Sequence, residues 1–403
     1  MRRRPSADRR SGESGGSPIH PDVIKLGMVS LLTDVSSEMI FSVFAIFFTT
    51  VAGGSAALLG VIEGVADLSS CSLDYLSGWW SDRTGRRKPL AVVGYGFSTL
   101  AKTILLVASS SAALGAFRVI ERLGKSFRGP PRDAWLASVA QRQVRGLSFG
   151  IHKALDKSGA ILGPLLAYGL LTVLGATAST YRALFRIAFV PALLAVVLLM
   201  LLRERAGERH THEHPLAAWK ALSSRFRRYL VAAGIFSLGY FSFGFLLLRA
   251  YDVGFSIRET VLLYALFNAA FVIAAPLVGR LGDRIGRTKI VLLGYVCYLL
   301  MCLGFAAASV RWEIIALFIL YGIFFSIDEA QSRAFIADIE PERRATAVGA
   351  YNFVTGGLYL LASIIAGALW ASGPGTVFML AAALSAIAAV VFLWSGREGH
   401  PES

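Results

Sequence analysis

The chain has 403 residues, of which 55% are hydrophobic and only 16% are charged. Soluble proteins carry about 25% charged residues, so this composition excludes a string of ordinary soluble domains and indicates a polytopic membrane protein. The formal net charge of +14 does not indicate nucleic-acid binding, because the charges alternate with long apolar runs instead of gathering on one soluble face. We therefore expect the lipid bilayer, and not a nucleic acid, to be the partner of most of the surface.

The apolar runs predict an all-α membrane protein with twelve transmembrane helices. Crossing a hydrocarbon core of roughly 30 Å takes about 20 helical residues. A basic, Gly- and Ser-rich segment, 1–22, is expected to be a disordered tail. The first half, 23–202, then contains apolar runs near 23–49, 57–80, 89–109, 112–130, 147–173 and 183–202. The second half, 229–395, contains runs near 229–249, 259–280, 289–309, 312–332, 346–369 and 374–395.

The segments between and after the halves are polar. Residues 203–228 predict a central cytoplasmic loop that ends in an amphipathic helix, and 396–403 predict a short tail. Most of the 40 Lys and Arg residues fall in segments that lie on the same side as the N-terminus. Because basic loops stay in the cytoplasm, both termini are expected inside, in a multi-pass protein of the plasma (bacterial inner) membrane.

An internal repeat relates the two halves. The spacing of Gly78, Asp82, Arg83, Gly85 and Arg86 recurs in the second half, in each case in a short loop after the second run of that half. The repeated positions are Gly279, Asp283, Arg284, Gly286 and Arg287. Two pseudo-symmetric six-helix halves joined by a loop are typical of transporters whose substrate site lies between the halves.

The first copy, GWWSDRTGRRK at 78–88, resembles the G-x-x-x-D-[RK]-x-G-[RK]-[RK] motif of the major facilitator superfamily, and 279–289 is a degenerate copy. The resemblance extends over essentially the whole chain. It implies the fold of that superfamily and transport by alternating access, without a cofactor. It also implies that this loop, including Arg87, gates access, with Asp82 bridging to the other half.

A second motif, Gly159-x-x-x-Gly163-Pro164, is similar to one associated with antiporters of the same superfamily. The two glycines, one helical turn apart, permit close helix packing, and the proline favours a bend. Plain helix packing without a coupling role is the alternative interpretation.

Ionisable residues inside apolar runs predict the coupling site, because charges at the bilayer centre are costly and usually functional. Asp34 and Glu38 share one face of the first run, and Arg118, Glu121 and Arg122 share one face of the fourth. Since these runs are antiparallel, depth matching predicts Asp34 level with Arg122 and Glu38 level with Arg118. The resulting ladder would line the cavity and exchange protons; a static network is the alternative.

Further candidates are less specific. Carboxylates of the second and fifth runs, with Glu63 among them, are expected mainly to hold or gate the interface between the halves. Aromatic residues of the seventh and tenth runs, including Phe243 and Phe325, are expected to form a wall that meets the substrate. The secondary candidates are Asp67, Lys102, Asp156, Tyr240, Tyr321 and Asp328.

Together these features predict a monomeric secondary transporter that exports a small-molecule organic solute in exchange for protons. Proton-coupled uptake of an organic anion is the alternative, since Arg118, Arg122 and Lys102 would suit an anion. A metal exporter using Asp34 and Glu38 as ligands, or a non-transporting membrane sensor, is less favoured. No nucleophile elbow, Walker loop or HExxH motif is present, so we expect neither an enzyme nor a bound metal or cofactor.

Overall fold

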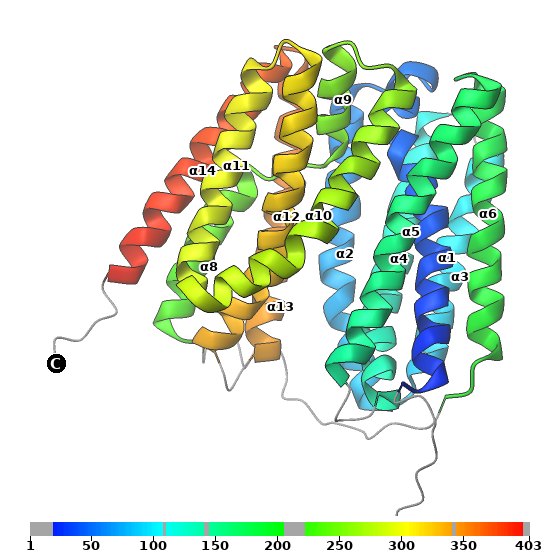
Figure 1. Cartoon of the computed structure of the whole chain (residues 1–403), viewed down its shortest axis with the longest axis horizontal. Helices are drawn as coiled ribbons and strands as arrows, with labels where there is room; N and C mark the ends of the chain where they lie inside the picture. Colours follow the sequence, from blue (N-terminus) through cyan, green and yellow to red (C-terminus); the bar gives the residue numbers. More distant parts are fainter. Residues whose placement is uncertain (1–18, 108–109, 141–144, 205–221, 341–343, 398–403) are drawn as a thin grey trace, which may run out of the picture.

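The computed structural model describes residues 19–107, 110–140, 145–204, 222–340 and 344–397. The described residues are mostly helical, and these helices trace twelve crossings in two bundles that stand side by side (Figure 1). The predicted all-α membrane fold is confirmed. The first bundle contains α1 (Pro21–Ile46) with a π-helical turn η1 (Phe47–Val51), α2 (Ala56–Thr84), α3 (Arg87–Val107), α4 (Ser111–Val139), α5 (Arg145–Leu174) and α6 (Ala178–Leu201). The second contains α8 (Ser224–Leu238), α9 (Gly244–Asp252), α10 (Ile257–Ile285), α11 (Arg287–Ala307), α12 (Arg311–Ile339), α13 (Arg344–Trp370) and α14 (Pro374–Arg397).

Helix α1 begins and α14 ends at the same end of the molecule, the lower edge of Figure 1. We call this end the tail end and the opposite one the far end. Within the described residues, eight helices are long and apolar enough by themselves to cross a membrane. Helix α4 is not among them, because its middle carries Arg118, Glu121, Arg122 and Lys125. Charged side chains inside a membrane must be shielded from lipid by neighbouring helices. Helix α4 packs against α2 and α3, which provide this shielding.

The seventh crossing differs from its prediction. The run 229–249 is not one helix, because α8 ends at Leu238 and α9 begins at Gly244. Gly239 starts the break: a β-carbon there would lie 3.1 Å from the carbonyl oxygen of Ala381, so this residue touches the backbone of α14. The Tyr298 hydroxyl donates to the Gly239 carbonyl at 2.9 Å and takes the place of a helical N–H. Glycine is less favourable than alanine inside a helix by about 1 kcal/mol, so ending the helix at this residue costs little free energy.

The repeated motif glycines end equivalent helices. Gly85 follows α2 with φ of 64°, and Gly286 follows α10 with φ of 89°. These positive φ values are costly for residues with a β-carbon, and glycine adopts them freely. Each glycine therefore stops a helix and turns the chain into the next one, which explains why both halves repeat it.

The halves meet along two helix pairs, α2 with α13 and α5 with α10. Near the far end, α2 and α13 approach backbone to backbone. A β-carbon on Gly367 of α13 would lie 2.7 Å from the carbonyl oxygen of Ala56, and one on Gly60 of α2 would collide with the carbonyl oxygen of Ser363. Small residues on both helices thus close the far end between the halves.

Candidate functional site

A cavity of about 590 Å³ lies between the two halves. Its wall on α2 extends from Glu63 to Asp74, and on α4 from Arg118 to Asp133, so the cavity runs from mid-bundle towards the tail end. The first half contributes nearly all of its charged groups. These are Asp34, Glu38, Glu63, Asp67, Asp74, Arg118, Arg122, Lys125, Arg128, Arg132, Asp133, Lys153, Asp156 and Lys157.

The two arginines of α4 pair with α2 and not with α1. Arg118 donates to both carboxylate oxygens of Glu63 at 2.6 Å, and Arg122 donates to Asp67 at 2.9 Å. The predicted ladder to Glu38 and Asp34 is therefore wrong in its partners. Helix α2 packs along α4, whereas α1 packs mainly on α5 and α6.

A sequence signal for this pairing existed. Helices α2 and α4 run in the same direction, from the far end to the tail end. Two carboxylates four residues apart on one helix then match two arginines four residues apart on the other, in the same order. Glu63–Arg118 and Asp67–Arg122 have the same sequence separation, 55 residues. A buried bidentate pair of this kind is neutral overall and geometrically fixed.

Two predicted residues lie behind the cavity wall. Lys102 of α3 and Glu121 of α4 are both 0% exposed, and neither lines the cavity. Lys102 donates to the Ser37 hydroxyl at 3.2 Å, and that hydroxyl donates to Glu121 at 3.2 Å. Glu121 also lies 3.8 Å from the Arg118 guanidinium. A continuous polar chain thus connects α3 through α1 and α4 to the arginine that holds Glu63.

Asp34 and Glu38 of α1 face the cavity without a cationic partner. Among the described residues, Asp34 has no hydrogen bond and no ion pair within 4.0 Å. Glu38 accepts a hydrogen bond from the Tyr264 hydroxyl of α10, in the other half. Both residues are less than 10% exposed, so their carboxylates are largely withdrawn from bulk solvent.

The glycine motif of α5 lies directly against this segment of α1. A β-carbon on Gly159 would be 3.0 Å from the Asp34 β-carbon, and one on Gly163 would be 3.2 Å from the Glu38 β-carbon. The two motifs that the sequence suggests separately therefore meet in one place. Pro164 follows within α5 and has no N–H, so it offers no helical donor to the carbonyl of Ala160, a cavity-lining residue.

Towards the tail end, the cavity contains further ion pairs. Arg132 lies 2.9 Å from Asp133 and 3.8 Å from Asp156. Lys153 of α5 donates to Glu329 of α12 at 2.8 Å and so joins the two halves. Both residues line the cavity, so this contact connects two of its walls.

The second half supplies an aromatic face. The Tyr240 and Tyr321 hydroxyl oxygens are 3.2 Å apart, and both side chains line the cavity. The Phe243 ring packs against Tyr264 at 5.0 Å and against Phe267 at 4.8 Å. Asp328 does not line the cavity; it accepts from the Ser332 hydroxyl at 3.4 Å.

Sequence reasoning missed two hydroxyl groups that cross between the halves, those of Tyr264 and Ser242. Tyr264 reaches Glu38, and Ser242 donates to Glu63 at 3.1 Å. The only signal was a hydroxyl residue within an apolar run, which single-sequence reading cannot separate from ordinary packing. Within the described part of the chain, no three His, Cys, Asp or Glu side chains form a group that could hold a metal ion.

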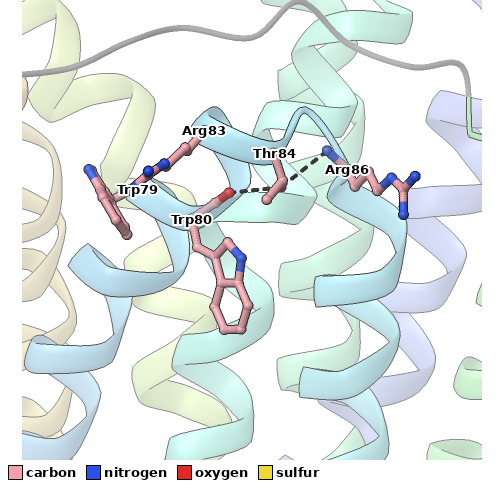
Figure 2. Close-up of a pocket in the computed structure, with 5 residues that line it drawn as sticks. All are labelled: Trp79, Trp80, Arg83, Thr84 and Arg86. Carbon is pink, nitrogen blue, oxygen red and sulfur yellow. Dashed lines mark hydrogen bonds between the residues drawn. The ribbon is translucent and has the colours of Figure 1, made fainter.

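The repeated motif at the end of α2 lines an open surface recess, which is not an enclosed site. Figure 2 shows Arg83 and Arg86 pointing to opposite sides of the turn, with Arg83 over the Trp79 ring at 5.2 Å. The Trp80 ring lies edge-on to Phe127, and Arg87 donates its backbone N–H to Glu204 at 2.5 Å. The helix α2 backbone places Gly78 against Pro130 of α4.

The second copy of the motif is simpler. Arg287 donates to Asp338 of α12 at 3.2 Å, whereas Gly279 has open space where a β-carbon would be and Arg284 lies in the last turn of α10. The side chains of Asp82 and Asp283 lie outside the described part of the structure. The expected bridge from Asp82 to the other half stays a prediction.

Comparisons with known proteins agree with the fold. The sequence model of the Major Facilitator Superfamily matches residues 26–256 and 229–403. An uncharacterized MFS-type transporter of Methanocaldococcus jannaschii is 33% identical over 380 residues, which cover 93% of this chain and 94% of the relative. The multidrug resistance protein MdtH of Cronobacter sakazakii is 29% identical over 147 residues, 35% of either chain. The crystal structure of a variant of the nucleoside transporter NupG superposes with a TM-score of 0.78 at 13% identity, covering 93% of this chain and 99% of that one.

Proposed function

Because this chain belongs to the major facilitator superfamily of transporters, we propose that it exports a small organic solute in exchange for protons. It would work by alternating access in the plasma membrane, with both tails in the cytoplasm. The observation that carries the proposal is the pair Asp34 and Glu38, two cavity carboxylates that have no cationic side chain within 4.0 Å among the described residues.

The charge balance of the cavity supports exchange. The charges of Arg118 and Arg122 are cancelled by Glu63 and Asp67. Asp34 has no such direct partner among the described residues, and a buried carboxylate that makes no ion pair or hydrogen bond is costly when ionised. It is stable when it is protonated or when a bound cation lies beside it. A site that can hold either a proton or a bound cation, but not both at once, releases the first when the second binds.

The opposite wall supports an organic solute. Tyr240, Phe243 and Tyr321 present rings and hydroxyl groups to a cavity of about 590 Å³, a size within the range of small-molecule sites. Such a wall favours a solute with an apolar or aromatic part. The partial similarity to a multidrug resistance protein points the same way. Both halves of one chain line the cavity, and the proposed transporter is a monomer.

Uptake of an organic anion is the second candidate, but it now rests on different residues. Arg118 and Arg122 are occupied by carboxylates, and Lys102 lies behind the wall. Lys125 lines the cavity without an ion-pair partner among the described residues, and Lys157 lies over the Phe271 ring at 4.3 Å. These two lysines are where an anion would bind.

The test is proton flux in proteoliposomes of the full-length protein, measured with a panel of organic cations, organic anions and sugars. Asp34→Asn and Glu38→Gln are compared with Asp22→Asn, a change on the same helix at a residue paired with Lys25 outside the cavity. Antiport predicts substrate-evoked proton movement opposite to the solute, abolished by the first two changes and retained in the third. Solute and proton moving together would support uptake, and solute flux without proton movement in all variants would refute the proposal.

A further inference from the structure

The break in the seventh crossing is organised around one buried serine, Ser242. Its N–H donates to the Ser363 hydroxyl of α13 at 3.2 Å, and its carbonyl accepts the N–H of Phe245 at 3.1 Å. Its hydroxyl accepts the N–H of Gly244 at 3.3 Å and donates to Glu63 of α2 at 3.1 Å. Every polar group of this residue is therefore engaged, and one of its bonds crosses to the other half.

Glu63 is held from both sides. Its two carboxylate oxygens accept from Arg118, and one of them also accepts from Ser242. Arg118 in turn neighbours Glu121, which begins the buried chain to Lys102. A hydrogen bond to a charged carboxylate is about twice as strong as a hydrogen bond between neutral groups. When such a bond is buried and breaks, no water molecule is at hand to take the place of the lost partner.

This contact lies beside the closure of the far end. Ser363 is the residue whose carbonyl meets Gly60 of α2. A β-carbon on Gly244 would come within 3.2 Å of the Ala45 β-carbon of α1, so the start of α9 also rests on the first half. If the far end opens between the halves, the broken segment must leave α2, and the bond from Ser242 to Glu63 must break.

We propose that the hydrogen bond between Ser242 and Glu63 is a latch that keeps the far end closed, with Ser242 as a positioning residue for the broken helix. Because Glu63 accepts hydrogen bonds from both Arg118 and Ser242, opening of the far end depends on how strongly Arg118 holds this carboxylate. The inference rests on the alternating access of the proposed function but not on its direction, its solute or its coupling ion.

The experiment measures the distance between spin labels at the far end, in full-length protein reconstituted in nanodiscs without added solute. Labels replace Leu58 on α2 and Trp312 on α12, two exposed residues in different halves, after the three cysteines are substituted. Ser242→Ala removes the latch. Ser237→Ala is the matched control, because its hydroxyl donates only within α8, to the Ala233 carbonyl at 2.7 Å.

Loss of the latch should raise the ratio of open to closed far ends about ten-fold. Ser237→Ala and Ser242→Thr, which keeps a hydroxyl, should stay within about two-fold of the parent. Ser242→Cys keeps the size and has a weaker donor, so it should shift the same way as Ser242→Ala if the alanine variant does not fold. Unchanged distances in both Ser242→Ala and Ser242→Cys, or an equal shift in Ser237→Ala, would overturn the latch. Failure of proton antiport with an intact distance shift would refute the proposed function and leave the latch standing.

Discussion

The contact between α1 and α5 predicts a strong effect of a single methyl group. In Gly163→Ala the new β-carbon would lie 2.7 Å from the Val35 carbonyl oxygen and 2.9 Å from the Met39 nitrogen. Ordinary contacts begin at 3.4 Å, so the α1 backbone would have to recede by roughly 0.7 Å. It cannot do so freely, because α6 packs on its other side, where the Ser36 hydroxyl donates to the Ala188 carbonyl at 2.5 Å. Overpacking of this kind costs about 1–3 kcal/mol.

The matched control is Gly169→Ala on the same helix, where a β-carbon meets nothing within 4 Å. Alanine is the better helix former by about 1 kcal/mol, so this variant should be as stable as the parent or more stable. Thermal unfolding in detergent, followed by far-ultraviolet circular dichroism, should therefore show a lower midpoint for Gly163→Ala alone. Solute flux should fall with it, because Glu38 moves with the displaced backbone. If both variants melted alike, the steric reasoning would be refuted.

Three further changes test other parts of the structure. Arg118→Lys cannot keep both bonds to its carboxylate and should unfold at a lower temperature and transport more slowly, which a melting curve and a flux assay check together. Lys153→Glu should lower flux by breaking the ion pair with Glu329, and adding Glu329→Lys should restore it; because the pair is half-exposed, stability should change by no more than about 1 kcal/mol. Gly286→Ala should lower the melting midpoint because φ is 89° there, whereas Gly279→Ala, in open space on α10, should not.

The fold was readable from the sequence because each crossing has its own apolar run, and because lipid gives the backbone no alternative to helices. The glycines of the repeated motif even marked where α2 and α10 end. The break after Leu238 was not readable. The run 229–249 is mostly apolar, with Ser237 and Ser242 inside it and Arg249 at its end, and a glycine such as Gly239 does not by itself distinguish a tolerated helical glycine from a break. What decides it is the α14 backbone and the Tyr298 hydroxyl, both remote in sequence.

The site was readable only in part, for a related reason. Sequence gives the depth of a charged residue but not the neighbour of its helix. Depth matching placed Glu38 level with Arg118, yet α1 turns this face towards α5 and α10, and Arg118 pairs with α2. Asp34 and Glu38 line the cavity, whereas Lys102 and Glu121 lie behind its wall. Whether a charged residue faces the cavity or lies behind its wall depends on how its helix is rotated about its own axis. That rotation is set by packing against all neighbouring helices together.

The distribution of polar contacts also limits how solute binding in the cavity can be linked to movement of the two halves. The ion pairs of Arg118 and Arg122 lie within the first half, so the halves can move relative to each other without breaking them. The hydrogen bonds from Tyr264, Ser242 and Lys153 cross between the halves, and each ends on a carboxylate that lines the cavity: Glu38, Glu63 and Glu329. A proton or a bound cation that satisfies such a carboxylate weakens its hold on the other half. Occupancy of the cavity and separation of the halves therefore act on the same groups, which is the physical requirement for coupling them.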